Sequence, residues 1–135
     1  MKIIRDYATD IISKMPDSDI FSILLQLIQS IQYDVIDQSS MASHLIERSK
    51  SNKQIAIFIY WYLKTENETG QTVKGTKNIA EKVQIYKNVF YTFKKTFEDS
   101  ELAETWEIIE QQEKFVSYLR DLSKAMKEMK NNSER

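Results

Sequence analysis

The chain contains no cysteine, one proline, one histidine and two glycines in 135 residues. The lack of cysteine excludes disulfide scaffolds, cysteine-containing zinc sites and thiol nucleophiles, and it fits a reducing compartment. Because so few residues favour tight turns, the turns must be few and the elements long, which predicts an all-helical chain. The only histidine, His44, has no second histidine or cysteine to complete a ligand set, and we expect it on a helix surface.

The chain also has no excess of charge of either sign, because its 19 Lys and Arg nearly balance its 20 Asp and Glu. A duplex-binding surface usually carries excess positive charge, so nucleic acid is not an expected partner. No apolar run is long enough to cross a bilayer. Residues 1–14 carry Asp6 and Asp10 where a signal peptide would be apolar, so no targeting segment is evident.

What is present is organised around residues 52–66, NKQIAIFIYWYLKTE, which contain an uninterrupted apolar run from Ile55 to Leu63. Such a run must be covered by other protein, and its composition alone would allow a strand. Its flanks favour a helix, because Asn52 is a good N-cap and the segment continues past strand length toward a stop near Gly70. We predict a central helix that is buried nearly all round.

Other helical patterns flank this segment. The first covers residues 3–12 and ends before Pro16, and Asp17 or Ser18 then caps a second one with a broad apolar arc. Ser39 or Ser40 caps a short helix. The apolar residues expected on these three helices are Ile3, Ile4, Tyr7, Ala8, Ile11 and Ile12; Ile20, Phe21, Ile23, Leu24, Leu25, Leu27, Ile28 and Ile31; and Met41, Leu45 and Ile46.

Residues 67–76 contain both glycines and predict a surface loop. Two long helices should follow, the second starting at Asp99 or Ser100, with a frayed polar tail over residues 131–135. Their predicted inward residues are Ile79, Val83, Tyr86, Phe90, Phe93 and Phe97, and then Leu102, Trp106, Ile109, Val116, Leu119, Leu122, Met126 and Met129. The chain thus predicts one all-α domain of about six helices, stacked as antiparallel helix pairs in an armadillo-like α-α superhelix.

No group of residues predicts a catalytic, metal or cofactor site. Residues 70–76 lack the lysine that a phosphate loop places directly after its second glycine. A carboxylate stripe at Glu101, Glu104, Glu107 and Glu110 is explained by the helix dipole, since metal binding would need ligands from a second element. Trp61, Tyr62 and Trp106 are better explained as core than as a stacking platform. We therefore expect no chemistry from this chain by itself.

Two stretches resemble the helical accessory domain of phosphatidylinositol kinases. Residues 19–34, DIFSILLQLIQSIQYD, resemble its Leu-rich helix. Residues 42–66 resemble its continuation, in which a Leu-Glu-Arg-like triplet, here residues 46–48, precedes an aromatic stretch, here residues 60–66. The family-motif core assigned by this resemblance consists of Leu24, Leu25, Leu27, Ile28, Tyr33, Phe58, Tyr60, Trp61 and Leu63.

The Tyr-Trp-Tyr sequence at residues 60–62 is most similar to the class III phosphatidylinositol 3-kinases, and residues 111–124 resemble the last helix of that domain. The short connection at residues 34–40 departs from the long polar insert of animal class III enzymes. The resemblance implies that residues 1–130 are the C-terminal part of a helical domain that spaces a C2 domain from a lipid kinase domain. Residues 131–135 would be its polar tail.

The same resemblance implies properties of a longer parent protein. The parent would phosphorylate phosphatidylinositol at the 3-position with ATP and Mg or Mn, in endosomal sorting and autophagy, with a regulatory pseudokinase-like subunit. It would be cytoplasmic and peripheral on endosomal or autophagic membranes, and this chain would meet membrane only through it. A phosphatidylinositol 4-kinase origin, a free-standing helical adaptor and a small helical enzyme are the competing hypotheses.

Overall fold

The computed structural model describes residues 2–34, 39–72 and 77–134, and these are helical with no strand among them, which confirms the all-α prediction. Armadillo-like stacking stays a prediction. The elements are α1 (Lys2–Ser13), α2 (Asp17–Ser22), α3 (Leu24–Ser30), the 3-10 turn η1 (Ile31–Tyr33), α4 (Ser40–Ser49), α5 (Lys53–Thr72), α6 (Lys77–Thr96), the 3-10 turn η2 (Ser100–Leu102) and α7 (Ala103–Ser133).

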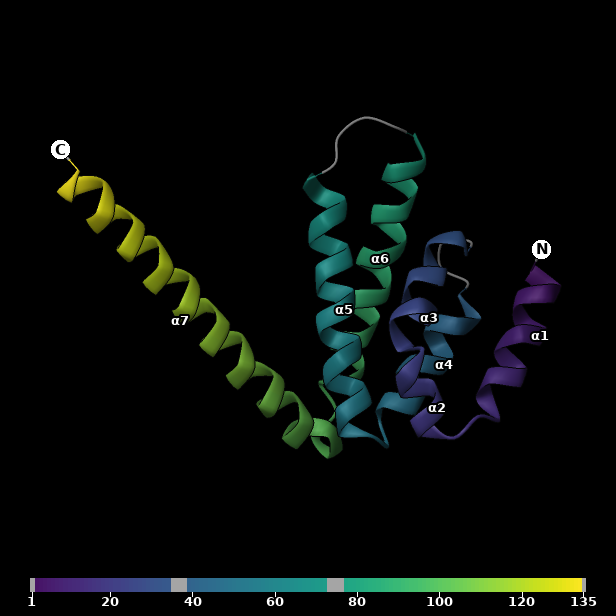
Figure 1. Ribbon diagram of the computed structural model, residues 1–135. Coiled ribbons are helices and arrows are strands. Elements are labelled where there is room, and N and C mark those ends of the chain that lie inside the picture. The colour runs from purple at the N-terminus through teal and green to yellow at the C-terminus, as the bar shows by residue number, and fades with distance from the viewer. Residues whose placement is uncertain (1, 35–38, 73–76, 135) are drawn as a thin grey trace.

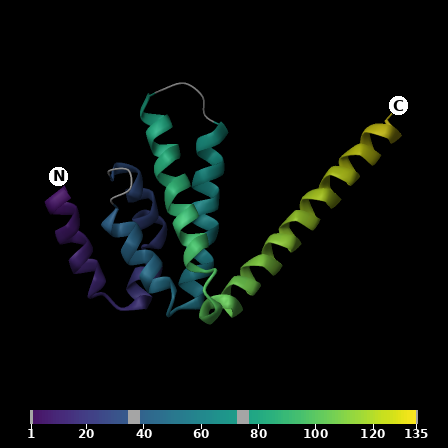
Figure 2. The same ribbon diagram turned by 180° about the vertical axis from the view of Figure 1, so that it is seen from behind.

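From one end of the molecule to the other lie α1, the group formed by α2, α3 and α4, the α5–α6 pair, and α7 (Figure 1). Helix α1 lies at one end and packs against α4, and both α3 and α4 pack against α5. Helices α5 and α6 form a long antiparallel hairpin, which makes the most extensive helix contact in the structure. At the opposite end α7 packs on the base of α5 and then leaves the body, as the reverse view shows as well (Figure 2).

One contiguous hydrophobic core runs from α2 to the first turns of α7. Its buried members are Ile20, Leu24, Leu27, Ile28, Ile31, Met41, Ala42, Leu45, Ile46, Ile55, Ala56, Ile59, Tyr60, Leu63, Ile85, Tyr86, Phe90, Phe93, Phe97 and Ile109. The predicted stripe of α6 is confirmed at Tyr86, Phe90, Phe93 and Phe97, and the side chain of Ile79 lies outside the described residues.

The central position of α5 is confirmed. The side chain of Asn52 caps the helix by accepting a hydrogen bond from the Ile55 amide at 3.1 Å. Within the apolar run only Phe58 is exposed, because the helices around α5 cover its side chain on only part of its surface. The predicted loop was wrong for residues 67–72, which continue α5 through Gly70, whereas residues 73–76 lie outside the described residues. Extending a formed helix past one glycine costs only about 1 kcal/mol.

The second predicted helix is divided in two at Ile23, whose φ of −117° and ψ of 14° leave the helical region. The Ile23 amide bonds to the Ile20 carbonyl at 3.1 Å, so a tight turn replaces the usual bond to the residue four positions back.

The predicted capping role of Asp17 was also wrong. Pro16 is the N-cap residue and makes no side-chain cap, and Asp17 pairs with Arg48 instead.

The predicted cap of α4 is confirmed, because the Ser39 hydroxyl accepts a hydrogen bond from the Ala42 amide at 3.0 Å. The start of the last helix is displaced, because Asp99 caps the turn η2 and α7 begins at Ala103. The predicted polar tail was wrong for residues 131–133, which are helical. The predicted inward face of α7 was wrong for Leu119, Leu122, Met126 and Met129, which are exposed because nothing described packs on that half.

Candidate functional site

Most of the predicted family-motif residues lie in the core. Leu24, Leu27 and Ile28 are buried on α3, and Tyr60 and Leu63 are buried on α5. These side chains fill the contact between α3 and α5 and between α5 and α6, so they build the body of the domain. Trp61 is half-buried against the same core.

The assignment to the core was wrong for Leu25, Tyr33 and Phe58, which are 38%, 72% and 37% exposed. Leu25 is the residue of α3 that follows the buried Leu24, and it points to the solvent side of a helix that has neighbours on only part of its surface. Phe58 is exposed on one side but packs edge-to-face on Phe21 at a centroid distance of 4.8 Å. The Tyr33 ring ends the turn η1 and has the guanidinium of Arg5 6.0 Å from its centroid.

A polar joint fixes the base of α7 to α5. The indole N–H of Trp61 donates to Gln112 Oε1 at 2.7 Å. The neighbouring Tyr60 hydroxyl and the Lys64 ammonium, one turn further along α5, both donate to the carboxylate of Glu113. We call these five residues the α5–α7 joint. They bind α7 at its start, since the helix is exposed from residue 117 onward.

The charges of the joint are set by their surroundings. Burial opposes ionisation of Glu113, but the hydrogen bonds from Lys64 and Tyr60 outweigh it and lower the pKa of the carboxyl. Burial, together with the hydrogen bond to Glu113, raises the pKa of the Tyr60 hydroxyl far above its usual value. The joint is therefore an ionised carboxylate held by one ammonium and one neutral hydroxyl.

A second polar centre lies at the other side of the body, around Arg48. Its Nη2 donates to the carbonyls of Ser13 at 3.0 Å and Met15 at 2.7 Å, and its Nε lies 3.5 Å from the carboxylate of Asp17. Asn52 donates to the same carboxylate at 3.1 Å. Arg48 thus ties the end of α1 and the start of α2 to the end of α4, just where α5 begins.

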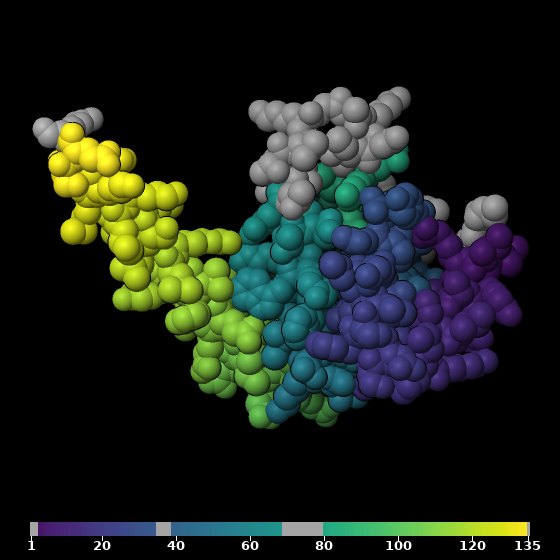
Figure 3. Space-filling view, in the orientation of Figure 1, coloured from purple at the N-terminus to yellow at the C-terminus, as the bar shows by residue number. Residues whose placement is uncertain are grey.

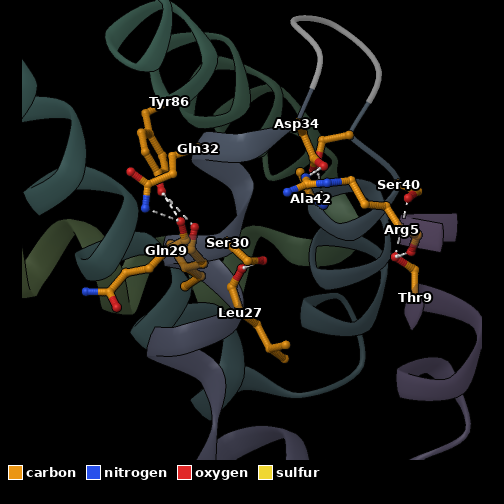
Figure 4. Close-up of polar contacts among 12 residues, drawn as sticks. Arg5, Thr9, Leu27, Gln29, Ser30, Gln32, Asp34, Ser40, Ala42 and Tyr86 are labelled. Atoms are coloured by element: carbon orange, nitrogen blue, oxygen red, sulfur yellow. Dashed lines mark hydrogen bonds and ion pairs between the residues drawn. The ribbon is translucent and has the colours of Figure 1, made fainter. Parts of the chain in front are cut away.

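Further along, α1 is held to α4 by polar contacts (Figure 4). Arg5 forms an ion pair with Asp34, whose side chain is almost fully buried, and Thr9 lies 3.3 Å from the Ser40 hydroxyl. The same figure shows the Tyr86 hydroxyl reaching the end of α3, where it donates to the Ile28 carbonyl at 2.9 Å. These bonds position helices whose ends would otherwise leave backbone groups unpaired.

Two apolar faces remain uncovered, one at each end of the molecule. On α1 the exposed face consists of Ile3, Ile4, Tyr7 and Ile11. On α7 it consists of Phe115, Tyr118, Leu119, Leu122, Met126 and Met129, along an arm that stands away from the body (Figure 3). Contiguous apolar faces of this kind indicate surfaces that meet another protein segment.

Features that would support chemistry are not found in the part of the chain that the structure describes. No three His, Cys, Asp or Glu side chains converge there to hold a metal, and none of its helices is long and apolar enough to span a bilayer. A hollow of about 150 Å³ between α4 and α6 is small for a ligand site and has no titratable side chain in its lining. Two wider hollows are open to solvent, one of about 540 Å³ beside Trp61 and Phe115 and one of about 480 Å³ whose lining includes Asp17, His44 and Arg48. His44 is half-buried on α4 rather than on the surface, and burial lowers its pKa.

Sequence patterns did not predict the roles of Arg48, Glu113 or Asp34. Each of these residues pairs with a partner that is distant in the chain, and the helical period carries no information on such pairs. All three residues lie in stretches that carried the family resemblance, namely residues 19–34, 46–48 and 111–124, but that resemblance did not indicate their partners.

Comparison with known proteins identifies one family. Residues 1–96 match the family described as "Phosphoinositide 3-kinase family, accessory domain (PIK domain)". That range contains α1 to α6, and therefore nearly all of the core, whereas the joint residues on α7 and the exposed arm lie beyond it.

Similar curated proteins are phosphatidylinositol 3-kinases. "Phosphatidylinositol 3-kinase VPS34" of Arabidopsis thaliana is 30% identical over 63 residues, which are 47% of this chain and 8% of that protein. "Phosphatidylinositol 3-kinase 2" of Dictyostelium discoideum is 36% identical over 67 residues, which are 49% of this chain and 4% of that protein. The matched stretch is thus a small part of each relative.

Proposed function

Because this chain belongs to the phosphoinositide 3-kinase accessory domain (PIK domain) family, we propose that it is a non-catalytic helical scaffold of a phosphatidylinositol 3-kinase. In this role it spaces a C2 domain from the lipid kinase domain of the same polypeptide. The observation that supports the proposal is a single core without a break from α2 to the base of α7, with an uncovered apolar face at each end. A body of this kind is stiff, and its two ends are available for neighbours.

The joint between α5 and α7 gives this role a mechanism. A spacer works only if the direction of its last helix is fixed relative to its body. The Trp61–Gln112 bond and the Glu113 carboxylate fix that direction at successive turns of α5, where the contact with α7 ends. Movement of one end would therefore be transmitted to the other through α5 rather than absorbed between the helices.

The chemistry belongs to the proposed parent protein. It would transfer a phosphoryl group from ATP, with Mg or Mn, to the 3-hydroxyl of phosphatidylinositol, and it would act in endosomal sorting and autophagy. A regulatory pseudokinase-like subunit would bind the parent, and membrane contact would come through the parent's other domains at endosomal or autophagic membranes. Relatives named phosphatidylinositol 3-kinases support the phosphorylation step. The cellular role, the subunit and the membranes are proposed from the resemblance to class III enzymes alone.

The first test is to read the source transcript on both sides of this chain. A reading frame that continues into a C2 domain and a lipid kinase domain supports the proposal. A frame without a kinase domain refutes it and favours the free-standing adaptor. The product formed on phosphatidylinositol vesicles, 3-phosphate or 4-phosphate, then separates the 3-kinase from the 4-kinase hypothesis.

The second test addresses spacing in the full-length protein. Gln112→Ala with Glu113→Ala removes the α7 half of the joint, and Lys124→Ala on the exposed arm is the matched control. A spacer predicts that the double variant loses several-fold activity on vesicles but keeps activity on a soluble short-chain substrate. Equal loss on both substrates, or no loss on either, would contradict a role in spacing.

A further inference from the structure

We draw no further inference here: the strongest candidate, the solvent-open hollow of about 480 Å³ at the end of α4, has two buried nitrogen atoms without a hydrogen-bond partner among the described residues, His44 Nε2 and Arg48 Nη1, but the carboxylates and cations in its lining pair with one another, and so nothing in the structure indicates the charge or the class of a ligand.

Discussion

Truncation of Trp61 to alanine tests whether the α5–α7 joint stabilises the fold. Removal of a fully buried Trp costs about 3–5 kcal/mol, but Trp61 is only half-buried, so the packing loss should be about half of that. The lost contacts include the edge-to-face pair with Tyr60 at 5.4 Å between centroids. Loss of the indole hydrogen bond to Gln112 adds about 1 kcal/mol. We expect Trp61→Ala to lower the free energy of unfolding by about 2.5–3.5 kcal/mol in total.

The assay is urea unfolding followed by circular dichroism, with thermal melting in parallel. For a chain of this length the expected loss corresponds to a fall in Tm of roughly 8–14 °C. Trp61→Phe is the matched control, because it keeps an aromatic ring but loses the N–H donor and part of the ring volume, and it should cost about 1–2 kcal/mol. If Trp61→Ala melted within two degrees of the wild-type chain, the joint would contribute nothing to stability and the spacing mechanism would lose its basis.

Three further predictions concern other parts of the structure. Phe93→Ala should cost about 3–5 kcal/mol because this ring is fully buried, whereas Phe115→Ala should stay within about 0.5 kcal/mol at low concentration, and equal losses in urea unfolding would contradict the exposed arm. Arg48→Ala should cost about 2–3 kcal/mol, because its hydrogen bonds to two carbonyls come from a charged group, and Arg48→Lys should recover less than half of that loss in the same assay. Burial lowers the folded-state pKa of His44, so the unfolded chain binds more protons below pH 6.5 and stability should fall as the pH drops through that value. His44→Gln should flatten this part of the stability profile, and an unchanged slope would show that other groups cause it.

The fold class and most of the core could be predicted because helical periodicity reports burial wherever a helix has neighbours on one defined side. The stripe of Tyr86, Phe90 and Phe93 on α6 was correct for that reason. The break at Ile23 could not be predicted in this way, since the apolar pattern continues through it and only the backbone changes direction. Periodicity reports which residues share a face but does not report whether the helix axis is continuous.

The candidate site was less predictable than the fold. The family resemblance pointed to Tyr60 and Trp61 as core residues, but nothing in the sequence showed that both bond to α7. Their partners Gln112 and Glu113 have the composition of ordinary helix-surface residues. A polar contact between distant helices depends on their packing geometry, and that geometry follows from the core only after the whole chain is folded.

Helical periodicity predicted burial correctly in the middle of the chain but not at its ends, where the apolar stripes of α1 and α7 are exposed. On α1 the residues that contact the body are the polar Arg5 and Thr9 and the apolar Ile12, while the apolar Ile4, Tyr7 and Ile11 are exposed. Exposing the apolar side of an amphipathic helix to water is unfavourable, unless another protein segment covers that side in the assembled protein. Periodicity therefore identified the apolar face of each end helix, and the error lay in assuming that this face packs against the described body.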